Sequence, residues 1–170
     1  MAQTDRDAMH EQVREYYGET LKSAKDLKTG ACCPVDAIPL HIRPLLANLE
    51  DEVVARSYGC GSPIPAALEG MTVLDLGCGT GRDVYIASQL VGEAGTVIGL
   101  DMTDEQLEVA IRTQDAHAKR FGHAKSNVRF VKGLLEDLGA AGIEESSIDV
   151  VISNCVLNLA PDKRPVLSEI

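Results

Sequence analysis

A run of glycines at the end of a short apolar segment is the feature of this sequence best suited to chemistry. Gly77, Gly79 and Gly81 follow the apolar residues 73–76 at alternate positions. Glycine lets a backbone turn sharply and approach a ligand closely, and a helix after the run would present unpaired N–H groups. The GxGxG spacing differs from the GxGxxG spacing of dinucleotide sites. The run therefore predicts a ligand-binding turn between a buried strand and a helix.

Two acidic residues accompany the glycine run. Asp75 lies two residues before Gly77, and Asp101 ends the next apolar segment, 20 residues after Gly81. An acid at the end of the second strand is well placed to accept hydrogen bonds from both hydroxyls of a ribose. A glycine-rich turn alone is also consistent with a purely structural role. The two acids together favour a binding site for a ligand that contains a ribose.

The cysteines are the second group that could do chemistry. Their number is odd, no two have CxxC spacing, and the N-terminus does not resemble a signal peptide, so reduced thiols are favoured over a disulfide framework. We expect Cys78, inside the glycine run, only to fill space. Cys155 should lie at the carboxyl edge of the sheet, either as an ordinary buried cysteine or as part of a site for a soft acceptor. The remaining three are Cys32, Cys33 and Cys60.

Strands and helices alternate in the part of the chain that carries the glycine run. Continuous apolar strands between helices indicate a parallel sheet covered on both faces, that is, a Rossmann-like doubly wound α/β domain. The first 65 residues instead predict a helical, cysteine-bearing segment. We expect strands over 71–76, 96–100, 127–131 and 148–154, helical spacing over 84–91, a capping box at 103–106 that opens a third helix, and upstream helices over 7–22 and from Pro44 to Val54.

Composition narrows the class of protein. The 170 residues carry a formal net charge of −10 and no Trp, which disfavours a nucleic-acid substrate. No apolar run is long enough to span a bilayer, so we expect a cytoplasmic protein without a membrane partner. The chain ends in what looks like the first turns of a helix, and we therefore expect the sheet to be incomplete at the C-terminus and the chain to be truncated.

The segment from Val73 to Gly81 resembles motif I of the class I S-adenosylmethionine-dependent methyltransferases. The resemblance implies an S-adenosylmethionine-binding domain over residues 66–170, truncated at its end. Gly77, Gly79 and Gly81 would cradle the methionine part of the cofactor, and Asp75 would support the loop. Further cofactor-binding residues implied by the resemblance are Asp101 at the ribose, Met102 on the adenine, Leu135 and Glu136 beside the adenine amino group, and Asn154 facing the methyl donor.

Four further segments resemble segments of the arsenite methyltransferase family that occur in the same order. They are Tyr16-Tyr17-Gly18, Ala31-Cys32-Cys33, Tyr58-Gly59-Cys60-Gly61 and Ser153-Asn154-Cys155-Val156. The resemblance covers nearly the whole chain. The resemblance implies that thiolates of Cys60 and Cys155 bind trivalent arsenic, a soft centre that selects sulfur. It also implies that Cys32 forms a disulfide with Cys60 when the arsenic is reduced between methylations, although Cys33 could substitute for Cys32. A small arsenic substrate and a thiol reductant, thioredoxin or glutathione, would be the partners.

One departure from the family pattern leaves alternatives open. The family's fourth functional cysteine belongs downstream of residue 170, so the third arsenic ligand is missing from this sequence. The chain could then be an inactive cofactor-binding fragment. A methyltransferase for another small molecule would keep the cofactor site without needing the thiols. A structural zinc site made from the cysteines is disfavoured, because such sites usually use closely spaced pairs.

Overall fold

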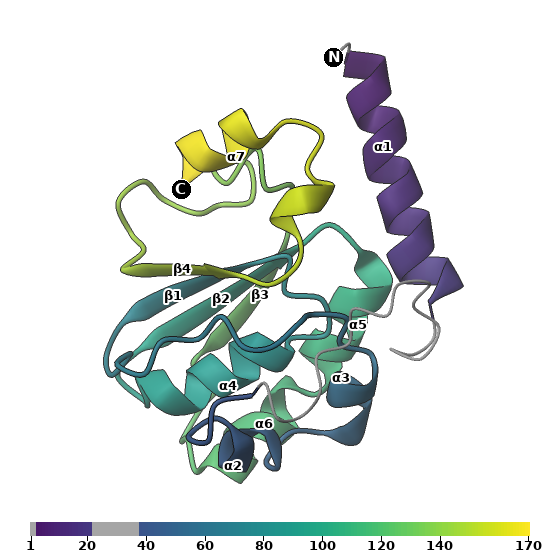
Figure 1. The fold of residues 1–170 in the computed structure, drawn as a ribbon. Coiled ribbons are helices and arrows are strands. Elements are labelled where there is room, and N and C mark those ends of the chain that lie inside the picture. The colour runs from purple at the N-terminus through teal and green to yellow at the C-terminus, as the bar shows by residue number, and fades with distance from the viewer. Residues whose placement is uncertain (1–2, 22–37) are drawn as a thin grey trace.

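A four-stranded parallel sheet forms the centre of the computed structural model, which describes residues 3–21 and 38–170. Its strand order is β3-β2-β1-β4, and every neighbouring pair is parallel. The predicted parallel α/β sheet is therefore confirmed (Figure 1). The observed strands are β1 (Thr72–Leu76), β2 (Thr96–Asp101), β3 (Val128–Lys132) and β4 (Val150–Ser153), each within two residues of the predicted start and end.

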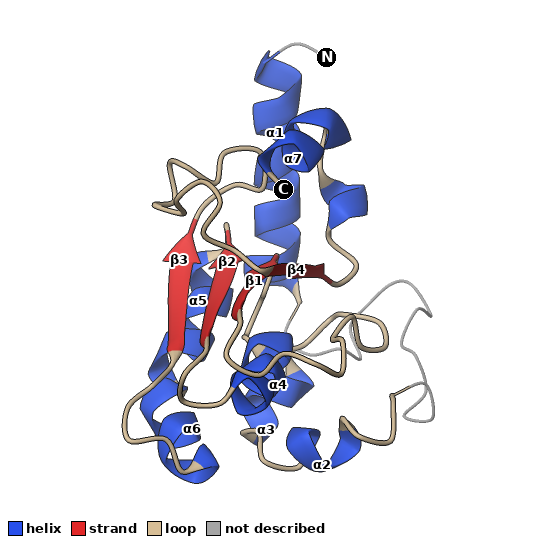
Figure 2. Ribbon diagram, turned by 90° about the vertical axis from the view of Figure 1, so that its left-hand side faces the viewer, coloured by secondary structure: helices blue, strands red, loops and turns tan. Residues whose placement is uncertain are grey.

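Helices cover one face of this sheet, and an extended connection covers the other. Helix α4 (Arg82–Val91) joins β1 to β2, and α5 (Asp104–Arg112) with α6 (Gln114–Phe121) joins β2 to β3, on the same side (Figures 1 and 2). The chain then crosses behind the sheet to β4, so its direction of winding reverses between β1 and β4. Residues 133–149 make this crossing without a helix in the described structure, and their Leu138 and Ile143 pack on the second face.

The alternating side chains of β1 connect these two layers. Val73 belongs to the core cluster on the helical face, whereas Leu74 and Leu76 belong to the cluster on the other face. Asp75 shares the helical face with Val73, because successive side chains of a strand point to opposite faces. A carboxyl group is therefore buried directly below the glycine run.

The N-terminal segment differs in detail from the prediction. Helix α1 (Gln3–Glu15) begins earlier than expected and continues into the π-helical turn η1 (Tyr16–Thr20). The helix predicted after Pro44 is two short helices, α2 (Arg43–Leu46) and α3 (Asp51–Ala55). Glu50 interrupts them with extended backbone, and its N–H donates to His117 Nε2 at 3.1 Å. The loop predicted around residues 29–34 lies outside the described residues.

The predicted capping box at the start of α5 is wrong. Thr103 occupies the N-cap position, but its side chain makes no capping hydrogen bond in the described structure. The Gln106 side chain instead donates to the backbone oxygen of Tyr17 at 2.9 Å. The sequence pattern is that of a capping box, but the glutamine at its end fixes η1 against α5.

No helix among the described residues is long and apolar enough to cross a membrane.

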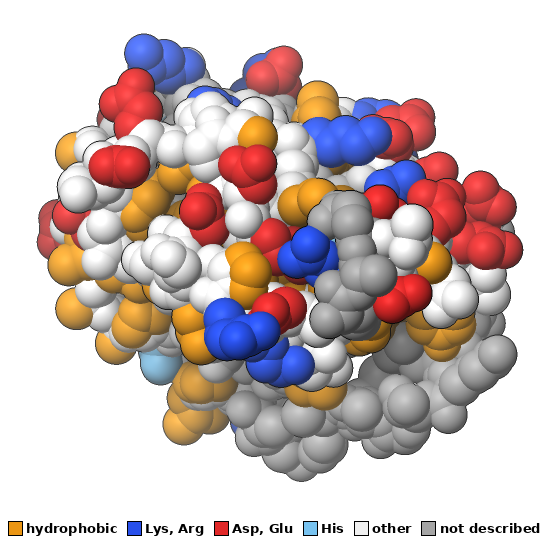
Figure 3. All heavy atoms as spheres, turned by 90° about the horizontal axis from the view of Figure 1, so that it is seen from above, with side chains coloured by type: hydrophobic (Ala, Val, Ile, Leu, Met, Phe, Trp, Pro, Cys, Tyr) orange, Lys and Arg blue, Asp and Glu red, His pale blue; other side chains and the backbone are white. Residues whose placement is uncertain are grey.

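The chain continues past β4 through the 3-10 turn η4 (Leu157–Leu159) to α7 (Lys163–Glu169). Both lie above the carboxyl ends of the strands, on the side where α1 also stands (Figure 1). On the face seen in Figure 3, acidic and basic side chains are interspersed.

Candidate functional site

A pocket of about 990 Å³, counting the space open to solvent, lies at the carboxyl ends of β1, β2 and β4. This is the point where the winding direction reverses, which is where open α/β sheets bind ligands. Helix α1 and turn η1 add a wall that the sheet does not provide. Lining residues that come from outside the glycine run and the strand ends include His10, Val13, Tyr17, Tyr58, Arg82, Asp83, Gln106 and Leu134.

Hydrogen bonds hold the glycine run against the end of β2. The N–H groups of Gly77 and Cys78 both donate to the backbone oxygen of Leu100, at 2.8 and 2.9 Å. The N–H of Gly79 donates to Asp101 Oδ2 at 2.8 Å. The loop is therefore fixed before any ligand binds, with the Asp101 carboxylate as part of its framework.

The three glycines serve different purposes. A Cβ atom on Gly77 would lie 2.5–2.8 Å from the Val156 side chain, and one on Gly81 would lie 2.9–3.0 Å from the Phe130 ring. A Cβ atom on Gly79 would meet only Gln106 Oε1, at 3.7 Å. All three have positive φ angles. Gly77 and Gly79 line the pocket, but Gly81, expected to cradle the ligand as well, is not among the lining residues and packs against the core.

Asp101 combines a structural and a binding role. Besides its bond to Gly79, its Oδ1 atom accepts from the N–H of Thr103 at 2.9 Å. Burial raises the pKa of Asp101, and the hydrogen bonds from Thr103 and Gly79 oppose that rise. Each carboxylate oxygen can accept two hydrogen bonds, so the group retains capacity for donors from a ligand, such as the hydroxyls of a ribose.

Two buried acceptor atoms in the pocket wall have no hydrogen-bond partner among the described residues. They are Asp75 Oδ1 and Gln106 Oε1. Burial, followed by the carboxylates of Asp83 and Asp101, raises the pKa of Asp75 well above its usual range. Unpaired buried acceptors are uncommon and costly. A ligand with a positive charge and several donors would satisfy them.

Met102, Leu135 and Glu136, the residues expected beside the adenine, line the pocket at the end away from Cys155. The sequence did not show that α1 reaches this end. His10 Nε2 lies 3.2 Å from Glu136 Oε1, which joins α1 to the segment after β3. An amphipathic pattern identifies a helix but not the surface that it covers, so this contact could not be predicted from the residue pattern.

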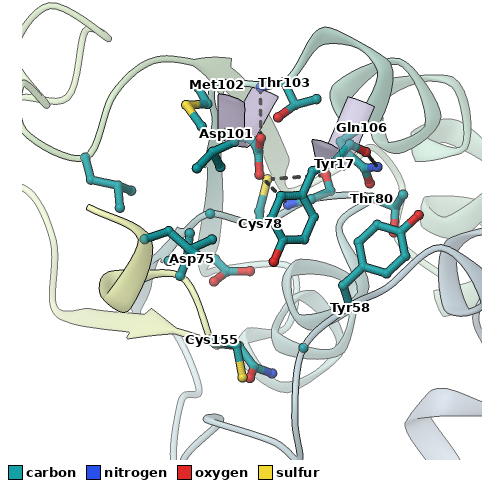
Figure 4. Close-up of a pocket in the computed structure, with 18 of the residues that line it drawn as sticks. Tyr17, Tyr58, Asp75, Cys78, Thr80, Asp101, Met102, Thr103, Gln106 and Cys155 are labelled. Carbon is teal, nitrogen blue, oxygen red and sulfur yellow. Dashed lines mark hydrogen bonds between the residues drawn. The ribbon is translucent and has the colours of Figure 1, made fainter. Parts of the chain in front are cut away.

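Cys155 lies at the opposite end of the pocket from Met102 and Thr103 (Figure 4). It follows β4, is exposed, and has a φ of +61°, a value that non-glycine residues rarely adopt. Such backbone strain is concentrated at functional sites. The strained turn directs the chain from β4 into the segment that packs on Gly77.

Cys60 reaches this end of the pocket from a distant part of the sequence. Its N–H donates to Asn154 Oδ1 at 3.0 Å, which brings its backbone to the residue before Cys155. Burial first, and then the neighbouring groups of Tyr16, Cys155, Cys60 and Tyr58, raise the pKa of Tyr17. The side chain of Cys155 lines the pocket, whereas Cys60 is not among its lining residues.

The other cysteines fall into two groups. Cys78 is buried in the core beside Gly99, as expected of a space-filling residue, and burial raises the pKa of its thiol well above the usual range. Cys32 and Cys33 lie outside the described residues. Among the residues that are described, no three His, Cys, Asp or Glu side chains are grouped so as to hold a metal ion.

The family model of a methyltransferase domain matches residues 67–170, which include the glycine run, Asp101 and Cys155. The chain belongs to this methyltransferase family. A fold neighbour, an S-adenosylmethionine-dependent methyltransferase from Aquifex aeolicus, is 25% identical with a TM-score of 0.51, over 62% of this chain and 50% of that one. These findings support the expected cofactor.

More specific relatives match almost the whole chain. The arsenite methyltransferase of Aquipseudomonas alcaligenes is 53% identical over 95% of this chain and 46% of its own length. That of Homo sapiens is 51% identical over 96% of this chain and 44% of its own length. The solved arsenic(III) S-adenosylmethionine methyltransferase of Chlamydomonas reinhardtii is 56% identical, with a TM-score of 0.76, over 77% of this chain and 44% of that one. The predicted resemblance is confirmed, and the chain spans less than half the length of these relatives.

The residues of the pocket fit S-adenosylmethionine. The cofactor carries a positive sulfonium and ammonium group, and the pocket offers the unpaired carboxyl oxygen of Asp75 and the carboxylate of Asp101. The open side of Gly79 leaves room for close approach by a ligand. When bound, the cofactor supplies an electrophilic methyl group.

Proposed function

We propose that this chain is the cofactor-binding part of an enzyme that methylates trivalent arsenic, with S-adenosylmethionine as the methyl donor. The proposal assigns arsenic to the thiolates of Cys60 and Cys155. The observation that carries it is the hydrogen bond from the Cys60 N–H to Asn154, because it brings two cysteines distant in sequence to one end of the cofactor pocket. The similarity to arsenite methyltransferases supports the choice of substrate.

The chemistry requires mainly desolvation and orientation of the arsenic atom. Thiolate ligands leave a lone pair on trivalent arsenic, and Cys60 and Cys155 would hold that arsenic at the end of the pocket where the cofactor would supply its methyl group. The arsenic lone pair attacks the methyl carbon, an As–C bond forms, and the electrons of the broken C–S bond return to sulfur as a neutral thioether. The arsenic is thereby oxidised from the trivalent to the pentavalent state.

Two cysteine thiolates then return two electrons to the arsenic and become a disulfide. We assign this disulfide to Cys32 and Cys60, with Cys33 as an alternative to Cys32. A thiol reductant, thioredoxin or glutathione, restores the thiols in the cytoplasm. The third arsenic ligand comes from an added thiol, water or a cysteine outside this chain.

Binding of phenylarsine oxide, which needs two thiolates, tests this proposal. We expect one equivalent to bind per chain, and the Cys60→Ser and Cys155→Ser variants to lose binding, because a hydroxyl is a poor ligand for a soft centre. The Cys78→Ser variant, in which the buried thiol inside the glycine run is changed, is the control and should bind phenylarsine oxide as the unmodified chain does. Mass spectrometry of the adducts gives the stoichiometry.

The alternatives predict different results for phenylarsine oxide binding and for two further assays. A methyltransferase for another small molecule would bind S-adenosylhomocysteine in calorimetry but would bind no phenylarsine oxide at these thiols. A fragment that binds both ligands but does not turn over would transfer no labelled methyl group to arsenite, even with glutathione present.

A further inference from the structure

We propose that Arg82 and Asp83, at the start of α4, are positioning residues that hold the Cys60 loop (residues 57–61) at the distance from Cys155 that arsenic binding needs. The inference rests on the proposed function for its substrate. It concerns two residues that the motif does not include, and it explains how a short segment without regular structure can present a thiol at a fixed place.

A chain of hydrogen bonds joins the Cys60 loop to α4 at two points. Arg82 donates from Nη2 to the backbone oxygen of Gly61 at 3.0 Å. The N–H of Cys60 donates to Asn154 Oδ1 at 3.0 Å, and Asn154 Nδ2 in turn donates to Asp83 Oδ2 at 2.8 Å. Residues 60 and 61 are therefore fixed by separate side chains, one donating and one accepting.

The two points are themselves linked by an ion pair. The guanidinium of Arg82 contacts both carboxylate oxygens of Asp83, at 3.0 and 3.2 Å. The side chains are only 12% and 7% exposed. A charged pair that is mostly buried and joined by two hydrogen bonds holds its geometry well, because moving either partner leaves the other charge unpaired.

Close packing completes the arrangement. A Cβ atom on Gly59 would lie 2.6–2.7 Å from the Asn154 amide group, so only glycine lets the loop approach this closely. Asn154 directly precedes Cys155. The Asn154 amide group therefore packs on Gly59, the residue before Cys60, while the Asn154 backbone leads directly into the strained turn at Cys155. Asp83 fixes the orientation of that amide group.

The position of the loop matters because arsenic must be held by two thiolates at once. After the first As–S bond forms, the second bond is intramolecular, and its strength depends on the effective concentration of the second thiol. A loop free to move lowers that concentration without changing the chemistry of either thiol. Loss of the Arg82–Asp83 pair should therefore weaken chelation specifically.

The test compares binding of phenylarsine oxide with alkylation of Cys60 by iodoacetamide, which needs one thiol only. In Arg82→Ala and Asp83→Ala we expect the dissociation constant for phenylarsine oxide to rise by about tenfold or more, as loss of hydrogen bonds to charged groups implies. The alkylation rate of Cys60 should stay equal or increase. Arg164→Ala is the matched control, since Arg164 also pairs with a nearby carboxylate, Asp162, but on the surface.

Arg82→Lys keeps the positive charge and provides a second test if Arg82→Ala fails to fold. A single ammonium group can pair with Asp83 but cannot contact both carboxylate oxygens and Gly61 with one planar fork. We expect this variant to melt near the temperature of the unmodified chain and to recover only part of the affinity for phenylarsine oxide.

The outcomes separate this inference from the proposed function. If the unmodified chain binds phenylarsine oxide through Cys60 and Cys155, and the Arg82 and Asp83 variants bind it equally tightly, the positioning role is wrong and the proposed function stands. The same holds if the variants only melt at a lower temperature while their folded fraction binds normally. If the unmodified chain does not use these two thiols, both proposals are overturned.

Discussion

Asp75 lies on β1, the strand that leads into the glycine run. Its carboxyl group is buried, and only 2% of the residue's surface is exposed. Its pKa is raised by burial and by the carboxylates of Asp83 and Asp101. The folded chain therefore holds the proton to a higher pH than the unfolded chain does. It follows that this group makes the cofactor-free protein less stable as the pH rises above about 4, the ordinary value for Asp.

The variant Asp75→Asn tests this dependence. Without the cofactor, we expect it to melt at a higher temperature than the unmodified chain at about neutral pH, because burial opposes ionisation of Asp75 in the folded chain, whereas Asn has no proton to lose on unfolding. The difference should shrink as the pH falls toward about 4, where both proteins are neutral at this position. Affinity for the cationic cofactor should fall in the variant. Thermal melts at a series of pH values measure the first effect, and a difference that does not shrink on acidification would contradict it.

The glycine run allows a second test at the scale of single residues. Gly79→Val places its side chain toward the open pocket, where only Gln106 is near, so it should block the cofactor at a modest cost in stability, about 1–2 kcal/mol for the left-handed backbone. Gly77→Val meets Val156 instead and should lower the melting temperature strongly. Calorimetry with S-adenosylhomocysteine and thermal melts distinguish the two. Normal binding by Gly79→Val would place the cofactor elsewhere.

Asp101 accepts hydrogen bonds from the N–H groups of Gly79 and Thr103, and a ribose would add further ones. We expect Asp101→Ala to weaken binding of S-adenosylhomocysteine by about 1.5–3 kcal/mol, the contribution of hydrogen bonds to a charged group. Asp104→Ala is the control, because Asp104 pairs with Lys132 on the surface. Equal affinities of the Asp101 variant and the unmodified chain in calorimetry would remove Asp101 from the ribose site.

At the scale of elements, α1 and η1 close one side of the pocket from end to end. His10 contacts Glu136, and the ring of Tyr17 lies 5.7 Å from the ring of Tyr58, in the segment that leads to Cys60. The Gln106 side chain holds η1 through the backbone of Tyr17. Side-chain contacts rather than strand pairing join this cover to the rest of the chain, so it should be easier to displace than the sheet.

Gly18→Val tests the role of this cover. A Cβ atom at Gly18 would lie 2.6 Å from Glu105 Oε2 and 3.1 Å from Thr103 Cγ2, so a larger side chain should push η1 away from α5. We expect faster dissociation of S-adenosylhomocysteine, measured by stopped-flow displacement, with little change in the melting temperature of the sheet. Gly139→Val, at an exposed glycine with open space around it, is the matched control. Equal dissociation rates in the two variants would contradict the role of α1 and η1 as a cover.

The elements show which patterns carry information about structure. Apolar runs such as 73–76 predicted strands because burial on both faces leaves a continuous signal. The interruption between α2 and α3 was missed, because it depends on the buried imidazole of His117, which is 67 residues away from Glu50 in sequence. The capping-box prediction at Thr103 was wrong for a similar reason, because the Gln106 side chain bonds to Tyr17, which is distant in sequence.

At the scale of the whole molecule, the topology explains why the site could be predicted in outline. Parallel strands bring Gly77, Asp101 and Cys155 to one edge of the sheet, so spacing along the chain was enough to group them. The approach of Cys60 was implied only by the family resemblance. Arg82 and Asp83 were missed, because charged residues at the start of a helix are usually exposed, and only the folded structure shows them bonded to the Cys60 loop.

X-ray absorption at the arsenic edge tests the central claim, that one end of a methyltransferase pocket holds trivalent arsenic on Cys60 and Cys155. The chain with bound arsenite should show sulfur ligands around arsenic. Cys60→Ser and Cys155→Ser should each lose one sulfur ligand relative to the unmodified chain, whereas Cys78→Ser should retain the original spectrum. An arsenic shell made of oxygen alone, or a sulfur count unchanged in both the Cys60 and the Cys155 variant, would contradict the account.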